Sequence, residues 1–162
     1  EKFLGYRIDM TFIQPYPHTI DSILLEKDKS LYSLIKEKVQ NVDLSLFESL
    51  ESGDVLFIDS THVAKTGSDV LYEIFEILPR LKKGVHIHFH DIFYPFEYPK
   101  QWVFGGRNWN ENYLLRSFLM YNEVFKIRLF PHYLHLNYPE VFEKLPLAYR
   151  NTGGSIWIEK MK

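Results

Sequence analysis

Cysteine is absent from the 162 residues of this chain, and its absence excludes several kinds of chemistry. Disulfide bonds, thiolate nucleophiles and cysteine-type zinc sites all require that side chain. No apolar stretch approaches the roughly 20 residues of a membrane-spanning helix, and no segment has the pattern of a secretory h-region. The net charge is −2 with both signs interspersed, so no basic surface for nucleic acid is expected. These absences favour a cytoplasmic protein that binds neither membranes nor nucleic acids.

Glycine-rich phosphate-binding motifs are also missing. The pairs Gly105-Gly106 and Gly153-Gly154 are isolated and typical of turns, so there is neither a Walker loop nor a dinucleotide fingerprint. Gly67-Ser68 lacks the flanking glycine pattern of a nucleophile elbow, which leaves catalysis by serine with little support.

The composition that remains is that of a folded protein. Hydrophobic residues make up 46% of the chain, which excludes a disordered polymer. The length suffices for one domain, residues 1–162, with its own core. Aromatic residues reach 17% and many follow position 90, where we expect a pocket wall or a partly apolar surface.

The stretch from Asp54 to Asp69, DVLFIDSTHVAKTGSD, organises the rest of the chain. Its apolar run Val55–Ile58 is typical of a strand buried on both faces of a parallel sheet. The run stops at Asp59, and polar residues including His62 follow. Ligands of open α/β sheets bind outside the carboxyl ends of strands, so Asp59 and His62 are the first candidates for chemistry. The alternative is that Asp59 only orients the loop.

Strand and helix patterns alternate along the chain. Strands are expected at 10–13, 35–42, 55–58, 85–93, 125–129 and 155–159, and helices at 19–34, 44–50, 68–78, 110–121 and 139–145. Ser68, or Thr66 with Asp69, is expected to cap the third helix, and Pro79 to end it. This order predicts an α/β fold of the doubly wound kind.

The strand VHIHFHDIF contains three histidines that alternation places on one face: His86, His88 and His90. Asp91 falls on the opposite face. Alternate strand residues lie about 6.5–7 Å apart, so two of the histidines could chelate an ion but all three span too far. A metal-dependent hydrolase is one interpretation. Core histidines at 86 and 88 are the other.

A second constellation joins two strands. Asp59 and Asp91 both terminate apolar runs that would be adjacent in a doubly wound sheet, with His62 and His90 beside them. The two acids suit a divalent cation, since carboxylate oxygens are ligands for such ions. Alternatively, an acid orients a histidine that acts as a general base, or the acids bind a polar cofactor edge. The sequence leaves these alternatives open.

Three segments resemble the class I S-adenosylmethionine-dependent methyltransferases: TFIQPYP, VQNVDLSLFESLESGDVLFIDSTHVAKTGSDV and LPRLKKGVHIHFHDIFYPFEYP. The similarity is to bacterial methyltransferase-domain proteins with a DSxH and an HDIFYPFEYP segment, and it extends from about Met10 to Glu159. The resemblance implies a Rossmann-like, mostly parallel sheet in the order 3-2-1-4-5-7-6. One strand near the carboxyl terminus would be antiparallel.

The resemblance also implies residue roles. Gln14 stands where the family has an acid that holds the ribose hydroxyls of S-adenosylmethionine, and its amide loses the charge-assisted hydrogen bond. Gln40 and Asn41 fall where the family contacts adenine. Asp59 falls beside the methionine part of the cofactor or a metal.

The resemblance implies that His62, His90 and Asp91 line the side of the site that binds the methyl acceptor. The expected reaction is methyl transfer to an oxygen or nitrogen of a small molecule. Either histidine would be the general base if the acceptor carries a proton. A metal-assisted variant would use Asp59 and Asp91 as ligands of a divalent cation.

The family's first strand and Gly-rich turn have no counterpart in the nine residues before Met10. That strand would be central, so its loss would leave unpaired edges inside the sheet. We expect a further amino-terminal segment, or a second chain in a homo-oligomer, to complete the sheet. A non-catalytic binding module that lost its cofactor site is the alternative from another class.

Overall fold

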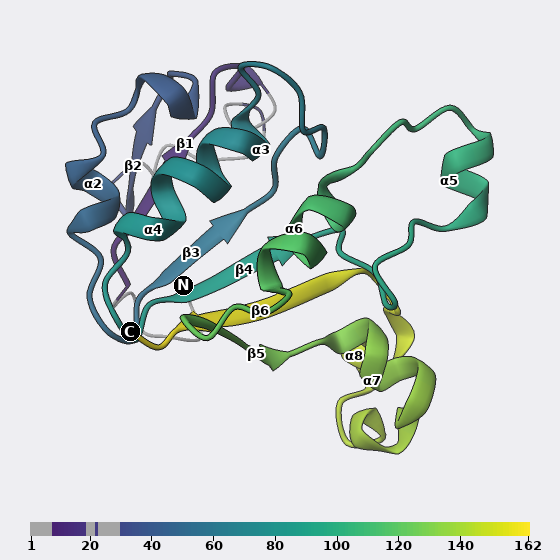
Figure 1. Cartoon of the computed structure of the whole chain (residues 1–162). Coiled ribbons are helices and arrows are strands. Elements are labelled where there is room, and N and C mark those ends of the chain that lie inside the picture. The colour runs from purple at the N-terminus through teal and green to yellow at the C-terminus, as the bar shows by residue number, and fades with distance from the viewer. Residues whose placement is uncertain (1–7, 19–21, 23–29) are drawn as a thin grey trace. The chain divides into compact units, whose positions relative to one another are not determined.

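A computed structural model describes residues 8–18, 22 and 30–162 (Figure 1). Backbone contacts divide the chain into two compact units, residues 1–43 and residues 44–162. The described residues form one sheet in each unit, of two strands in the first and four in the second. No helix in the described ranges is long and apolar enough to cross a membrane.

The amino-terminal unit pairs β1 (Met10–Ile13) with β2 (Tyr32–Ile35) in parallel. β1 confirms the first predicted strand. The prediction of a strand at 35–42 was wrong. That segment holds the short 3-10 helix η3 (Val39–Asn41), and β2 ends at Ile35. The apolar residues after Ile35 are too sparse to alternate. Most of the helix expected at 19–34 lies outside the described residues, and its last residues form β2.

The carboxyl-terminal unit holds a mixed sheet in the order β3-β4-β6-β5. Its strands are β3 (Val55–Ile58), β4 (His86–His90), β5 (Phe125–Leu129) and β6 (Ser155–Lys160). β3 and β4 are parallel, whereas β6 runs antiparallel to β4 and β5 on either side of it. The antiparallel strand near the carboxyl terminus is therefore confirmed.

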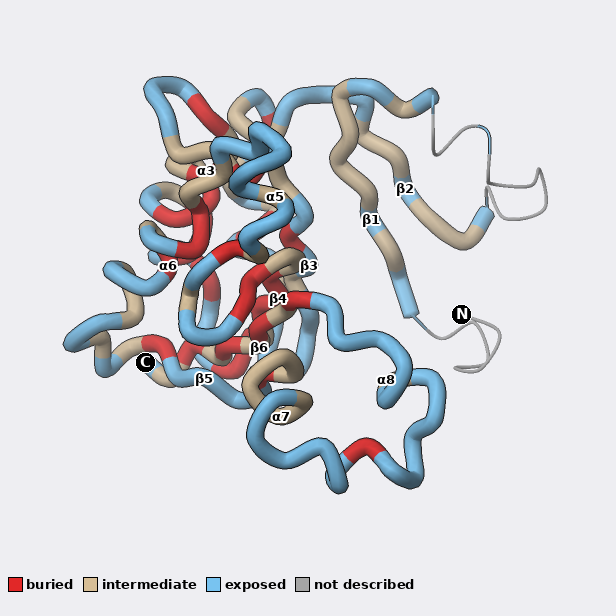
Figure 2. The backbone as a smooth tube through the Cα atoms, turned by 90° about the vertical axis from the view of Figure 1, so that its right-hand side faces the viewer, coloured by how far each residue is buried: buried red, intermediate tan, exposed pale blue. Residues whose placement is uncertain are grey.

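The core of this unit lies between the sheet and a helical layer on one of its faces (Figures 1 and 2). Ile87 and Phe89 of β4 and Ile156 and Ile158 of β6 are fully buried there. The helical layer supplies Val70, Ile74, Leu78 and Leu115. Because strand residues alternate, the histidines of β4 lie on the other face, as predicted.

β3 departs from its prediction in one respect. Val55 and Phe57 are 50% and 58% exposed, so the strand is not buried on both faces. In the described part of the chain β3 pairs only with β4, and β1 only with β2. No described strand pairs with both β1 and β3, as the resemblance implies for the family's first strand. The α/β class is confirmed, and the complete doubly wound order remains a prediction.

The helix after β3 runs as three consecutive segments: α3 (Asp69–Tyr72), the π-helical η4 (Glu73–Ile77) and α4 (Leu78–Arg80). Ser68 caps it by accepting a hydrogen bond from the Leu71 amide, as predicted. Pro79 does not end it, because the helix continues one residue further, to Arg80. The predicted pair of Thr66 with Asp69 does not cap it either, since Asp69 accepts hydrogen bonds from Thr61.

The other helices of the described residues are α2 (Ser45–Glu48), α5 (Lys100–Phe104), α6 (Glu111–Leu119), α7 (Pro131–Asn137), η5 (Pro139–Phe142) and α8 (Pro146–Arg150). α2 and α6 confirm two predicted helices, and η5 is shorter than its prediction. α5, α7 and α8 were missed. They are too short for a hydrophobic period, and the last two begin at a proline, which is favoured at a first helical position.

Candidate functional site

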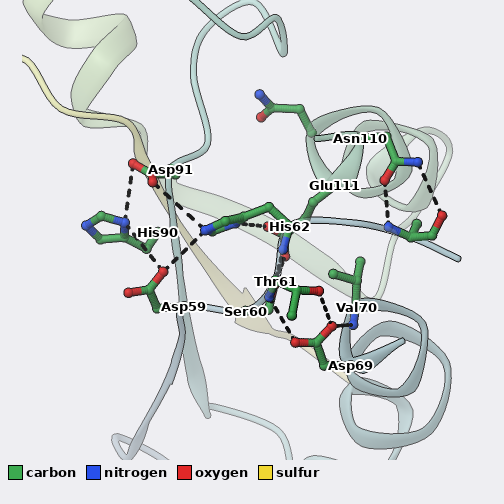
Figure 3. Close-up of polar contacts among 12 residues, drawn as sticks. Asp59, Ser60, Thr61, His62, Asp69, Val70, His90, Asp91, Asn110 and Glu111 are labelled. Atoms are coloured by element: carbon green, nitrogen blue, oxygen red, sulfur yellow. Dashed lines mark hydrogen bonds and ion pairs between the residues drawn. The ribbon is translucent and has the colours of Figure 1, made fainter. Parts of the chain in front are cut away.

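The carboxyl ends of β3 and β4 bring together the two acids that the sequence singled out (Figure 3). Asp59 follows β3 and Asp91 follows β4, and these strands are parallel neighbours. Asp91 has a left-handed backbone, with φ of 54°. Because of this turn, Asp91 does not follow the strand alternation that was expected to place it opposite the histidines. Its Oδ1 lies 3.3 Å from Nδ1 of His90. Three of the predicted residues thus meet at one edge of the sheet.

His62 lies at the centre of this cluster. Its Nδ1 is 2.7 Å from Oε2 of Glu111, the first residue of α6. Both side chains are buried, with 5% of His62 and 1% of Glu111 exposed. Ser60 Oγ donates to the other Glu111 oxygen at 3.3 Å, so the carboxylate is held on both sides. A carboxylate in this position fixes both the ring orientation and the tautomer of a histidine.

The opposite ring nitrogen of His62 faces the predicted acids. Nε2 is 3.4 Å from Oδ1 of Asp59 and 3.9 Å from Oδ2 of Asp91. Burial alone lowers the pKa of His62, but the hydrogen bond to Glu111 and the charges of Glu111, Asp91 and Asp59 outweigh it and raise the pKa above 6.5. His62 is therefore a stronger base than an ordinary histidine.

The loop that carries His62 is fixed against the start of α6. The His62 carbonyl accepts hydrogen bonds from the amides of Asn110 and Glu111. The Asn110 side chain pairs with the Ala64 backbone, accepting from its amide at 2.6 Å and donating to its carbonyl at 3.2 Å. Thr61 is held in turn by Asp69 of α3. These bonds maintain the left-handed backbone of His62, whose φ is 58°.

Glu111 is the functional residue that the sequence analysis missed. It is one residue beyond Asn110, where the helix predicted at 110–121 was expected to begin. Asn110 does occupy the cap position, but its side chain bonds to Ala64 and not to the helix. An acid in the first turn of a helix is so common that it gave no signal of its own.

His90 lies at the rim of the cluster, with 45% of its side chain exposed. Its Nδ1 is 3.8 Å from Oδ1 of Asp59, in addition to its contact with Asp91. No residue comparable to Glu111 orients it within the described structure. Both histidines adjoin the same two carboxylates, but His62 is buried and its ring is oriented by Glu111, whereas His90 is more exposed to solvent.

The remaining strand histidine, His88, has a structural environment. Its ring stacks on Phe57 at 4.8 Å and contacts Trp157 at 4.6 Å. Burial, and then the charge of His90, lower its pKa to about 4. It is buried with an unpartnered Nδ1. A core histidine is the interpretation that these contacts favour, and the described residues contain no group of three or more His, Asp or Glu side chains placed to hold a metal ion.

An aromatic wall adjoins the His62 ring. The Trp109 ring lies 4.2 Å from it, and Trp102 meets Trp109 edge-to-face at 5.2 Å. Tyr98 contacts Trp109 at 5.8 Å, and its hydroxyl accepts from the Asn112 amide. These aromatic residues, all after position 90, adjoin the predicted site.

The predicted cofactor residues are divided between the two units. Gln14 follows β1, and its Oε1 accepts a hydrogen bond from the Tyr16 amide at 3.3 Å. Gln40 and Asn41 lie in η3, where Asn41 donates to Glu37 at 3.1 Å. These three residues belong to the amino-terminal unit, and Asp59 to the carboxyl-terminal unit. Their assembly into one cofactor site remains a prediction.

Comparison with known protein families identifies the family to which this chain belongs. A family model described as a methyltransferase domain matches residues 8–92, which is more than half of the chain. The chain belongs to this methyltransferase-domain family. No curated protein and no solved structure gives a significant match. The matched range of the methyltransferase domain includes Asp59, His62, His90 and Asp91, and it ends before Glu111 and the aromatic wall.

Family membership confirms the resemblance to class I S-adenosylmethionine-dependent methyltransferases. It supports methyl transfer as the general activity. Family membership does not assign roles to individual residues, nor does it identify the methyl acceptor or the activity of this chain.

Proposed function

We propose that this methyltransferase domain transfers a methyl group from S-adenosylmethionine to an oxygen or nitrogen of a small molecule, with His62 as the general base. The observation that carries the proposal is the buried Glu111–His62 pair, in which the other ring nitrogen, Nε2, faces Asp59 and Asp91 at the carboxyl ends of β3 and β4. A base that is itself oriented by a carboxylate is the usual arrangement for activating a hydroxyl or amine.

The proton transfer follows from the geometry of His62. The acceptor loses a proton as it gains the methyl group, and Nε2 receives that proton. Nδ1 stays hydrogen-bonded to Glu111, whose negative charge stabilises the imidazolium that forms. Asp59 and Asp91 add to this stabilisation from the other side of the ring. His62 therefore accepts a proton without leaving an uncompensated charge in a buried site.

S-adenosylmethionine, when bound, supplies an electrophilic methyl group on a sulfonium, and it also carries an ammonium. Asp59, which is half exposed, and Asp91 offer carboxylates that suit these positive charges. Gln14, Gln40 and Asn41 are proposed to contact the ribose and the adenine. In this proposal the acidic cluster orients the cofactor, and positioning supplies most of the rate acceleration. A divalent cation at Asp59 and Asp91 is a variant that chelation tests.

The first experiment measures cofactor binding by calorimetric titration with S-adenosylmethionine and S-adenosylhomocysteine. It uses the 162-residue chain and a chain extended at its amino terminus. Micromolar binding by either chain supports the cofactor assignment, and binding by the extended chain alone would support an added strand that completes the sheet. Absence of binding by both chains contradicts the proposal.

The second experiment measures S-adenosylhomocysteine release with a panel of hydroxylated and aminated small molecules. His62→Asn and His90→Asn are compared, because both remove a histidine beside the same acids and only His62 is oriented by Glu111. His62→Asn should lower kcat by about 10²–10⁴-fold, which is the usual worth of a general base. A large loss in His90→Asn alone would assign the base to His90. Loss of activity on adding a chelator would favour the metal-assisted variant.

A further inference from the structure

Arg107 lies against the aromatic wall of the proposed acceptor side. Its guanidinium carbon is 4.1 Å from the centre of the Trp102 ring and 5.0 Å from that of Trp109. The Arg107 amide also donates to the Trp102 carbonyl at 3.0 Å, which fixes the base of the side chain. The Trp109 ring in turn contacts the His62 ring at 4.2 Å. Aromatic contacts therefore run without interruption from His62 to a fixed positive charge.

The position of the Arg107 guanidinium over the Trp102 ring leaves its N–H groups available for hydrogen bonds. A guanidinium that lies over an indole uses its flat face and keeps its in-plane N–H groups for an acceptor. Arg107 is exposed, and no carboxylate lies within ion-pair distance of it in the described part of the chain. A planar donor fork of this kind suits a carboxylate or a phosphate.

The charges of the His62 cluster dictate how an anionic molecule would lie. Asp59, Asp91 and Glu111 supply three carboxylates beside a single buried histidine. They repel an anion and favour an uncharged hydroxyl or amine at His62 Nε2. Arg107 attracts the anionic group to the far side of Trp109. One molecule would thus meet opposite electrostatic preferences at its two ends, which fixes its orientation.

We infer that Arg107, whose guanidinium lies over the Trp102 and Trp109 rings, is a specificity-determining residue that selects a methyl acceptor with a carboxylate or phosphate at the end remote from the methylated group. The flat part of the acceptor lies along Trp109. The inference rests on the proposed function, since it assigns the acceptor for the same site.

The test measures binding independently of methyl transfer, by calorimetry with matched probes. 4-Hydroxybenzoate is compared with 4-hydroxybenzamide, which has the same shape without the charge, and phenyl phosphate is compared with phenol. The first pair reports on a carboxylate and the second on a phosphate. In the wild-type protein at least one charged probe should bind roughly tenfold or more tightly than its neutral partner, as expected for a charge-assisted fork.

Three variants show whether Arg107 causes the difference. Arg107→Gln should abolish the preference for the charged probe, and Arg107→Lys should restore only part of it, because an ammonium lacks the planar fork. Lys100→Gln is the matched control, since it removes an exposed positive charge from the same aromatic segment and should leave the preference unchanged. Circular dichroism spectra confirm that each variant is folded.

The outcomes separate this inference from the proposed function. Equal binding of charged and neutral probes by the wild-type protein overturns the inference, including the case in which neither binds. A preference that survives in Arg107→Gln, or that Lys100→Gln removes, overturns it as well. An Arg107-dependent preference supports it. If that preference is found while no hydroxylated probe is ever methylated, the anion site stands and the proposed transfer fails.

Discussion

His62 and Glu111 are 49 residues apart in the sequence, yet Nδ1 of the histidine and Oε2 of the glutamate are 2.7 Å apart. Both side chains are buried, so neither is hydrated enough to be stable in charged form by itself. Each is stabilised by the other and by the acids around Nε2. The pair therefore couples the loop after β3 to the start of α6, and its integrity decides both the basicity and the orientation of His62.

Replacement of Glu111 by glutamine should uncouple this pair. Glutamine keeps the volume but loses the charge that raises the pKa of His62, so that pKa should fall. Activity should fall by about 10²-fold or more, since the ring loses its preferred tautomer. The imidazole pKa is measured by NMR titration. Glu97→Gln, at an exposed acid that bonds Tyr113, is the control and should change neither quantity.

The activity of the methyltransferase domain should depend on the protonation of His62. Because its pKa is raised, kcat/KM should rise with pH along a limb that lies above pH 6.5. The stabilising effect of the charged His62 is complete below pH 6.5 and is lost as the pH rises through the raised pKa. A pH–rate profile and urea unfolding across pH 6–9 check both statements. A limb below pH 6.5 would contradict this assignment of the base.

His88 should make stability depend on pH in the direction opposite to that of His62. Its pKa is lowered to about 4 in the folded protein, so between pH 6.5 and pH 4 the unfolded chain binds more protons. Stability should fall as the pH falls through this window, by at most about 3 kcal/mol from this group. His88→Phe keeps a ring between Phe57 and Trp157 and should abolish this contribution. His86→Gln, at a less buried histidine of the same strand, is the control and should leave this contribution unchanged.

Glu73 is a buried acid that costs stability at neutral pH. It is 8% exposed, and its Oε2 has no hydrogen-bond partner. Burial, and then the charges of Glu111 and Asp69, raise its pKa well above 4.5, so stability declines as the pH rises above 4.5. Glu73→Gln should therefore change little at pH 4 and stabilise by about 1–3 kcal/mol at pH 8. Glu76→Gln, at a more exposed acid of the same helix, should show no such pH-dependent gain.

Gly84 cannot be replaced without damage to the turn before β4. Its φ is 85°, and an added Cβ would meet the side chain of Ser52. The Gly84 amide also bonds to the Lys160 carbonyl, which joins the turn to the end of β6. Gly84→Ala should cost about 2–4 kcal/mol in unfolding free energy. Gly67→Ala has a similar φ of 73° but open space around the Cβ, so its cost should be only about 1–2 kcal/mol.

Local pattern was sufficient for much of the carboxyl-terminal unit. The runs that form β3 and β4 are each followed by an acid, and parallel neighbours bring such ends to the same edge. Asp59 and Asp91 could therefore be placed together before the structure was known. The alternation of the β4 histidines and the face of α3 also depend only on residues close in the sequence.

The tertiary structure alone decided which of these residues could act. Glu111 reaches His62 only because α6 packs beside the loop after β3, and nothing in the local sequence marks that contact. The left-handed turn at Asp91 reversed its predicted side, and the exposure of Phe57 reversed its predicted burial. The sequence by itself determined the strands of the carboxyl-terminal unit and the polar residues at their ends, because short-range periodicity and chain stiffness set them. The basicity of His62, the aromatic contacts of His88 and the position of Arg107 over Trp102 were decided by long-range packing, since desolvation and charge pairing depend on neighbours that the chain supplies from a distance.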